Sequence, residues 1–394
     1  MNRRAKLMIP GPVEVSPEVL EVMGQPLLPH YEAEFAQTHA DTIEKAKAVF
    51  QTTGDLFILV GSGSAGLEAC LNQLAGQGKI LIPTNGAFGK LLVRIAKTYS
   101  DQVEEVEFSD QEPIPPEALD RLLTERQDVR SVAVVHSETH AGLLNRVQAY
   151  GDICRAHGAL FMVDTISSLG GARLEMDAWK IDLCVTASQK ALGAPPGLCM
   201  VAVSPRCWPL FEKRAGGPGW YLNLNAWKKR SIEGADWHPT LSTMAVNNFL
   251  ALRRALELAL EEGLENRFAR HKRFSLLVRQ AIRSLGLAPY VPDAYASPTL
   301  TAVVLPEGTK AQDFRNYIRN EHGIMVGGAN IPCGERAFRI GHMGPEATLE
   351  NVLSVLIAVE EYLRKIGWDV KAGQCLAGVD PRLLSQSEGH PASE

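Results

Sequence analysis

Short apolar segments rich in Val, Ile and Leu alternate with amphipathic stretches as far as residue 203. Apolar runs of this length are typical of strands buried on both faces, and the stretches between them have helical periodicity. Strands that alternate with helices predict a mostly parallel sheet, here of seven strands, with helices on both faces. The predicted strands are Leu56–Val60, Lys79–Pro83, Val103–Glu107, Ser131–Val135, Ala159–Val163, Ile181–Thr186 and Leu198–Val203. The predicted helices between them include Gly66–Ala75, Phe88–Tyr99, Pro116–Arg126 and Arg146–His157.

The pattern changes after residue 240. One long helix is predicted over Thr243–Glu262, and a second follows over Leu264–Ser284. Shorter predicted strands and a last helix come next: Leu300–Leu305, His322–Val326, Ala337–Ile340 and Thr348–Ile366. We therefore expect an N-terminal arm at residues 1–15, a large domain at 16–260, a smaller α+β domain at 261–380 and a flexible tail at 381–394.

The composition is that of an ordinary globular protein. The 394 residues are 45% hydrophobic and carry a formal net charge of −5, which excludes a disordered chain and a protein-wide basic surface for nucleic acid. No apolar run has the length of a membrane span and the N-terminus does not resemble a signal peptide, so we expect no membrane partner and a cytoplasmic protein. The seven cysteines form no CxxC pair, which argues against a disulfide framework and a zinc ribbon. Metal binding is not expected, and His136 and His140 are the pair to check.

A glycine-rich loop follows the first predicted strand. It reads Gly-Ser-Gly-Ser-Ala-Gly over residues 61–66 and stands directly before a helix. A dinucleotide-binding fingerprint would also need an acidic residue about 20 positions on, and none follows the second predicted strand. Small residues at a helix N-terminus bring backbone N–H groups together where the partial positive charge favours an anion. The loop therefore predicts a phosphate cradle, with an ordinary tight turn as the alternative.

Polar residues follow three consecutive predicted strands. Lys190 lies among small residues before a Pro-Pro-Gly turn, and partial burial there would lower the pKa of its amine and make it nucleophilic. Asp164 ends the strand before it, and residues 136–142 (His-Ser-Glu-Thr-His-Ala-Gly) follow a still earlier strand. A lysine and a carboxylate at one sheet edge are the pair that Schiff-base chemistry on pyridoxal phosphate requires. If Lys190 is considered without the other segments, the simpler interpretation is a lysine in an exposed loop.

Arg339 stands between apolar residues on a short predicted strand. An arginine in such a place needs an anionic partner. Its planar guanidinium suits a bidentate grip on a carboxylate. The carboxylate could belong to a substrate or to a glutamate of the same chain.

Together these segments resemble the class V aminotransferases of pyridoxal-phosphate fold type I, in the branch of the alanine–glyoxylate and serine–glyoxylate aminotransferases. The most specific segments are SQKALGAPPG at residues 188–197 and FMVDTISSLGG at residues 161–171. The resemblance extends from Pro10 to about Glu361. It implies an α/β fold with a large cofactor-binding domain and a smaller C-terminal domain, pyridoxal 5'-phosphate as the cofactor, and a homodimer.

The resemblance also implies a role for each candidate residue of the cofactor site. Lys190 matches the lysine that forms the internal aldimine and then transfers protons, and Asp164 matches the acid that pairs with the pyridine nitrogen. The other matches are to the phosphate loop (Ser62, Gly63 and Ser64), a phosphate contact (Gln189), a hydroxyl contact to the ring oxygen (Thr139) and an aromatic ring stacked on the cofactor (Phe88).

Four further residues match the substrate site and the dimer contacts of the family. Arg339 matches the arginine that binds the substrate carboxylate. Tyr31 stands near the substrate entrance, where the family often has an arginine. Trp237 and Thr240 match an aromatic residue and a threonine that come from the neighbouring subunit, although the family often has a tyrosine in place of Trp237.

The function implied is a ping-pong aminotransferase that moves an amino group from a small L-amino acid, alanine or serine, to a 2-oxo acid such as glyoxylate or pyruvate. Three alternatives stay open. A pyridoxamine–pyruvate aminotransferase shares a similar tyrosine and arginine but has Glu-Pro in its phosphate loop. A lyase like the cysteine desulfurases would use Cys333, and a subunit that has lost activity would serve only as a partner.

Overall fold

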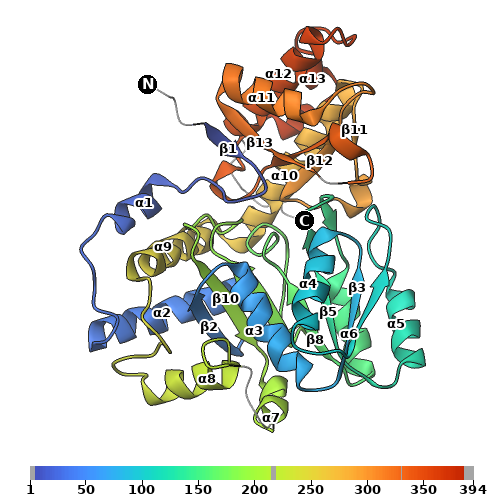
Figure 1. Cartoon of the computed structure of the whole chain (residues 1–394). Coiled ribbons are helices and arrows are strands. Elements are labelled where there is room, and N and C mark those ends of the chain that lie inside the picture. Colours follow the sequence, from blue (N-terminus) through green and yellow to red (C-terminus); the bar gives the residue numbers. More distant parts are fainter. Residues whose placement is uncertain (1–4, 214–218, 330, 386–394) are drawn as a thin grey trace, which may run out of the picture.

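Two β-sheets, each with its own helices, form the two parts of the molecule (Figure 1). The computed structural model describes residues 5–213, 219–329 and 331–385. The large sheet has seven strands in the order β2-β10-β9-β8-β5-β3-β4, and only β10 runs antiparallel to its neighbours. This confirms the predicted mostly parallel sheet. Its strands are β2 (Asp55–Val60), β3 (Lys79–Thr84), β4 (Val103–Glu107), β5 (Val129–Val135), β8 (Leu160–Asp164), β9 (Leu183–Ala187) and β10 (Leu198–Val203).

Both faces of the large sheet are buried, because side chains of one strand alternate between two apolar clusters. On β2, Phe57 and Leu59 pack in the cluster that contains α3 and α4, whereas Ile58 packs in the cluster on the opposite face. The first face is covered by α3 (Gly63–Ala75), α4 (Ala87–Lys97) and α8 (Leu224–Glu233). The second is covered by α2 (Ala33–Phe50), α5 (Pro116–Glu125), α6 (Val147–Ala156) and α9 (Val246–Glu262).

The second sheet has five strands in the order β1-β13-β14-β12-β11. Its edge strand β1 comes from the N-terminal arm and pairs in parallel with β13, so part of the predicted arm belongs to this sheet. The strands are β1 (Lys6–Met8), β11 (Ala288–Pro289), β12 (Leu300–Val304), β13 (Ile324–Gly328) and β14 (Ala337–Gly341). The helices packed with them are α10 (Leu264–Ser284), α11 (Ala311–His322), α12 (Leu349–Lys365) and α13 (Gln374–Ala377).

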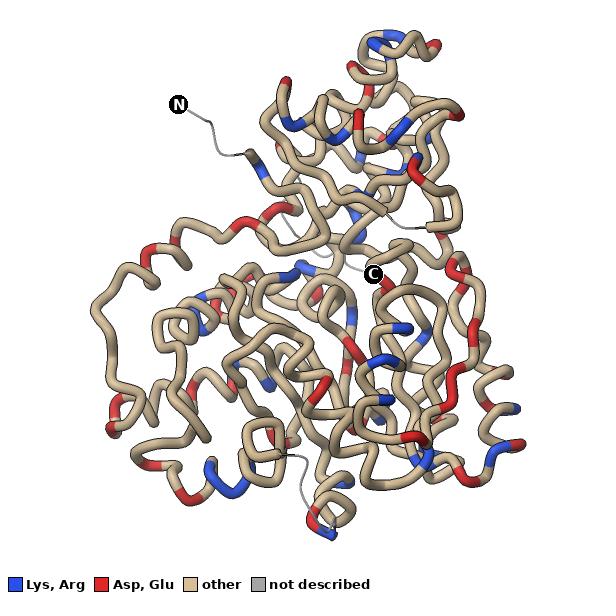
Figure 2. The backbone as a smooth tube through the Cα atoms, viewed as in Figure 1, with Lys and Arg blue, Asp and Glu red and all other residues tan. Residues whose placement is uncertain are grey.

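The remaining elements are short or lie at the edges of these two parts. They are α1 (Pro17–Met23), α7 (Trp208–Phe211) and a small hairpin of β6 (Ser137–Glu138) and β7 (Leu143–Leu144). Acidic and basic residues are intermingled over both parts (Figure 2). Within the described ranges, no helix is both long and apolar enough to cross a bilayer. Of the predicted tail, residues 386–394 lie outside the described residues.

Candidate active site

The three polar segments singled out in the sequence lie at one edge of the large sheet. Strands β5, β8 and β9 are parallel neighbours, and Asp164 at the end of β8 pairs in register with Val135 of β5 and Val185 of β9. His136–Thr139 therefore follows β5, and Ser188–Lys190 follows β9, at the edge that faces the second sheet (Figure 1). The carboxyl ends of parallel strands are the usual place for a binding site in such sheets.

Lys190 is held beneath the N-terminal arm. Its Nζ donates to the carbonyl oxygen of Pro10. Gly11, at φ +91°, passes so close that a Cβ on it would lie 2.8 Å from Nζ. Burial and the nearby Arg339 cation lower the pKa of Lys190 to about 8, although the Asp164 carboxylate opposes this shift. The side chain is therefore the partly desolvated amine that the sequence predicted.

Asp164 is a buried carboxylate, with 4% of its surface exposed. Its Oδ1 accepts a hydrogen bond of 2.8 Å from the backbone N–H of Ile166. Burial raises its pKa to about 6, while that N–H and the Lys190 cation act in the opposite direction. A carboxylate with so little hydrogen bonding in a buried place is free to take a cationic N–H partner.

Arg339 reaches from β14 of the second sheet to the edge of the large sheet. Its Nη1 donates to the carbonyl oxygen of Thr139 at 2.9 Å, and its Nε donates to that of Gly328 at 2.6 Å. Among the described residues, no carboxylate lies within 4.0 Å of the guanidinium, so the intrachain ion pair considered from the sequence is not formed. Burial lowers the pKa of Arg339. A half-buried arginine with only carbonyl partners can accept an external carboxylate.

The hydroxyl group of Thr139 points toward the loop after β8. Its Oγ1 donates to Ser167 Oγ at 2.6 Å. Both residues are almost fully buried. Ser167 had no role in the sequence prediction, although it lies three residues after Asp164. Thr139 thus joins the Arg339 region to the Asp164 loop.

Glu138 is the residue that sequence reasoning missed. Its fully buried carboxylate accepts hydrogen bonds of 3.1–3.2 Å from the backbone N–H groups of Phe88, Gly89 and His140. The first two belong to the first turn of α4, where a helix favours negative charge. Burial raises the pKa of Glu138 to about 7, although hydrogen bonds from these three N–H groups lower it. Glu138 therefore fixes the position of Phe88 and of the chain beside Thr139.

Replacing Glu138 with glutamine should lower the free energy of unfolding by about 2 kcal/mol, because one carboxylate oxygen becomes an NH2 group that faces backbone donors. Unfolding in urea would measure the loss. Glu107→Gln is the matched control, because the Glu107 carboxylate is exposed and pairs with Lys90 at the surface, and its replacement should leave the urea midpoint unchanged. Equal stability of Glu138→Gln and the wild type would contradict the assigned role.

The glycine loop forms the N-terminus of α3 beside this group. Ser62 is the N-cap residue, and its side chain makes no capping hydrogen bond. Ser62 and Ser64 are exposed, whereas Gly63 is buried so tightly that a Cβ would lie 2.5 Å from Ile166 Cδ1. Gln189 adds a buried Oε1 that has no hydrogen-bond partner among the described residues. Open donors at a helix N-terminus and an unsatisfied amide next to Lys190 fit a phosphate group.

Tyr31, Trp237 and Thr240 lie apart from the Lys190 group. Tyr31 and Trp237 are 50% and 54% exposed, and both lie next to the ring of His238. Thr240 is buried and donates to the carbonyl oxygen of Ser242 at 2.9 Å. Within the described residues of one chain, none of these three residues makes a hydrogen bond or ring contact with Lys190 or Asp164.

Neither a lyase that uses Cys333 nor a metal site at His136 and His140 is supported by neighbouring side chains. Cys333 is half-buried against an apolar cluster that includes Tyr290 and Ala337. His136 is buried, and burial lowers its pKa to about 3. Within the described part of the chain, no three His, Cys, Asp or Glu side chains are grouped as metal ligands would be.

Comparison with known proteins gives the same family as the sequence motifs. The family model for class V aminotransferases matches residues 19–340. The alanine–glyoxylate aminotransferase of Oryctolagus cuniculus is 30% identical over 364 residues, which cover 91% of this chain and 92% of that protein.

Two solved structures share almost the whole fold. The ureidoglycine–glyoxylate aminotransferase of Bacillus subtilis superposes with a TM-score of 0.90 at 31% identity, covering 96% of this chain and 97% of its own. The pyridoxamine–pyruvate aminotransferase of Mesorhizobium loti gives a TM-score of 0.91 at 31% identity, covering 95% and 96%. The chain therefore belongs to the class V aminotransferases and is a transaminase that depends on pyridoxal phosphate.

Proposed function

We propose that this enzyme transfers the amino group of a small L-amino acid, alanine or serine, to a 2-oxo acid such as glyoxylate or pyruvate. The observation that carries the proposal is the half-buried Arg339 guanidinium, which has carbonyl partners but no carboxylate among the described residues. It lies close enough to Lys190 to lower the pKa of that amine. Amino acids and oxo acids share the carboxylate that such an arginine would bind.

The residues around Lys190 can divide the work of transamination. Pyridoxal phosphate, when bound, supplies an aldehyde and a ring that withdraws electrons. Lys190 would hold the aldehyde and then, once released, take the proton from the substrate Cα. Asp164 would keep the ring nitrogen protonated. Thr139 would donate to the ring oxygen, Phe88 would stack on the ring, and Ser62, Gly63, Ser64 and Gln189 would hold the phosphate.

We further propose that Tyr31, Trp237 and Thr240 act in the site of a second subunit. The support is that none of the three makes a hydrogen bond or ring contact with Lys190 or Asp164 within the described chain, and that two large rings are exposed. Exposed aromatic side chains that lie together are typical of subunit interfaces. Sedimentation of the wild type beside Trp237→Glu would test this, and a wild-type monomer would contradict it.

A panel of amino donors tests the proposed substrates. The loaded enzyme is mixed with alanine, serine, aspartate, cysteine or pyridoxamine, and the change in the visible absorption of the cofactor reports each half-reaction. Rapid turnover with alanine or serine, completed by glyoxylate or pyruvate, would support the proposal. Reaction with pyridoxamine alone would indicate the pyridoxamine–pyruvate type. Sulfide release from cysteine that disappears in Cys333→Ser would indicate the lyase instead.

Replacing Arg339 with glutamine should raise the KM for both the amino acid and the oxo acid by about 10- to 100-fold, because a charge-assisted grip on the carboxylate is lost. Steady-state kinetics with each substrate varied would measure the change. Arg336→Gln is the control, since this arginine lies just before β14 and contacts the carbonyl oxygen of Leu305. An unchanged KM in Arg339→Gln would contradict the assignment.

Recombination of the cofactor-free enzyme with pyridoxal phosphate should depend on pH through Lys190. Only the neutral amine attacks an aldehyde, and burial lowers the pKa of this amine to about 8. We expect the rate to rise with pH up to about 8 and then to level off. In Arg339→Gln the rise should move to higher pH, because the arginine cation helps to lower this pKa. A wild-type rate that still rises at pH 10 would contradict the expectation.

A further inference from the structure

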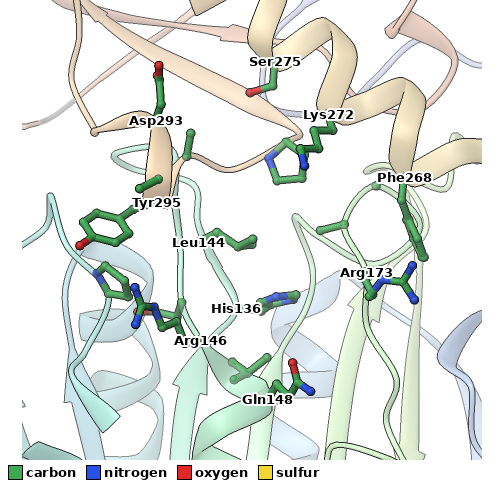
Figure 3. Close-up of a pocket in the computed structure, with 18 of the residues that line it drawn as sticks. His136, Leu144, Arg146, Gln148, Arg173, Phe268, Lys272, Ser275, Asp293 and Tyr295 are labelled. Carbon is green, nitrogen blue, oxygen red and sulfur yellow. The ribbon is translucent and has the colours of Figure 1, made fainter. Parts of the chain in front are cut away.

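One cavity of the described chain lies between the two parts of the molecule, and Lys190 is not among its lining residues. It has a volume of about 1090 Å³ and is lined by the start of α6, by α10 and by residues 293–296 (Figure 3). None of the candidate residues of the active site lines it. His136 links the two sites, because it lines the cavity and its backbone N–H donates to the carbonyl oxygen of Asp164 at 2.8 Å.

The carboxylates of the cavity wall already have cationic partners. Glu265 pairs with Arg173, and Asp293 pairs with Arg279. Asp152 pairs with Lys180, which does not line the cavity.

Two cations of the wall have no such partner. Among the described residues, no carboxylate lies within 4.0 Å of the side chain of Arg146 or Lys272. Arg146 only stacks on the ring of Tyr295, at 5.6 Å from its centre. The lining as a whole has four cations and three carboxylates, a net charge of +1, and Arg146 and Lys272 are its two cations without a carboxylate partner among the described residues.

Other groups of the wall would also stabilise an anion. The N-terminus of α6 has no side-chain cap, and the residues of its first turn line the cavity, so the positive end of the helix dipole lies at this wall. His136 is 98% buried at the inner end, and its Nδ1 has no hydrogen-bond partner among the described residues. Its ring is drawn at the centre of the group of lining side chains, below Leu144 and above Gln148 (Figure 3). A buried, unsatisfied polar atom beside a helix N-terminus and unpaired cations is uncommon in a wall without a ligand.

Much of the remaining wall is apolar or aromatic, with Asn145, Gln148 and Ser275 as further polar residues. Trp179, Phe268 and Tyr295 contribute rings to it. Pockets of this size that combine an apolar wall with a few converging polar groups are typical of small-molecule sites. From this combination we infer that the cavity binds a small organic anion with a planar or apolar body, its phosphate or carboxylate group at Arg146 and the start of α6, with the Lys272 cation on the opposite wall.

Binding of phenyl phosphate and of benzoate to the pyridoxal-phosphate-loaded enzyme tests the inference, with saturation-transfer NMR and calorimetry as the measurements. We expect at least one of the two anions to bind and uncharged benzyl alcohol not to bind. The double variant Arg146→Ala, Lys272→Ala should weaken binding by at least about tenfold, because the positive charges that attract the anion are lost. Lys229→Ala, a surface lysine on α8, should bind as the wild type does.

Two outcomes would overturn the inference. One is that neither anion binds, or that benzyl alcohol binds as tightly. The other is that the double variant keeps full affinity while Arg339→Gln loses it, which would place the ligand in the active site. Because binding is measured without turnover, a failure here is distinguishable from a failure of the proposed substrates. Cofactor absorption and urea unfolding of the double variant confirm that it is folded.

Discussion

Replacing Lys190 with alanine should reduce kcat for transamination by about 10⁴-fold, the upper range for loss of a positioned acid–base group. Lys190 is the only lysine or arginine between residues 181 and 205, and the nearby Arg339 stays protonated at any working pH and cannot take its place. The variant should also fail to retain the cofactor covalently after borohydride treatment. Stopped-flow absorption with alanine and mass analysis of the peptide around residue 190 would measure both losses.

Lys180→Ala is the matched control for this experiment. Lys180 lies ten residues earlier and forms an exposed ion pair with Asp152, so its loss should change neither kcat nor the cofactor peptide. A Lys190→Ala protein that kept more than a hundredth of the wild-type rate, or that still bound the cofactor covalently at residue 190, would contradict the assignment.

The large sheet was predictable because its strands are short apolar runs that are buried on both faces. Leu198–Val203 and Val103–Glu107 agree with β10 and β4 at both ends, and the long helix Leu264–Ser284 agrees with α10. Strand β4 is a half-exposed edge strand that reads Val-Glu-Glu-Val-Glu. For β10 the local signal is strong, since burial on two faces leaves little room for polar residues. Local pattern and tertiary environment demand the same side chains there.

Elements with weaker local signals were not predicted. Strand β1 has only three residues, Lys6–Met8, and its partner β13 lies more than 300 positions away. Helix α11 is strongly polar and buries only Ala311, Phe314 and Ile318. Such segments become ordered through contacts that the local sequence does not show. For the same reason the sequence could not indicate that the arm reaches the Lys190 amine through Pro10.

Some residues of the candidate site could be predicted from the sequence and others could not, for the same reason. Lys190 and Asp164 could be found because both follow apolar strands, where a buried charged residue stands out. Glu138 stands in an equivalent place, yet its partners on α4 are about 50 residues away and are backbone groups, which have no sequence signature. Tyr31 and Trp237 are harder still, because their proposed role depends on a second chain.

The electrostatics of Lys190 and Asp164 are interdependent. Burial moves the two pKa values toward each other, to about 8 and about 6. Each charge partly opposes the shift of the other. Both groups are therefore mostly ionised near pH 7, but each pKa lies close to that pH, so either group can change its protonation state at low cost. This suits groups that must exchange protons or accept a cationic partner.

Replacing Asp164 with asparagine should lower kcat by about 10³-fold, as expected when a preorganised charge beside the reacting group is lost. Asparagine has nearly the same shape and can still accept from the N–H of Ile166, so the fold should be kept. An amide cannot balance the positive charge of a protonated ring nitrogen, and the ring would then withdraw electrons poorly. Single-turnover kinetics with alanine, normalised to bound cofactor, would measure the loss.

Asp182→Asn separates this role from a general effect of removing a buried carboxylate. Asp182 is fully buried just before β9, where it accepts from Ser204, Arg206 and the backbone N–H of Phe161. Its replacement should lower the stability to urea but leave the single-turnover rate of the folded enzyme within about twofold, because the fold is damaged at a point away from the site. Equal rate losses in the two variants would show that Asp164 acts through structure, whereas a loss confined to Asp164→Asn would assign it to the cofactor ring.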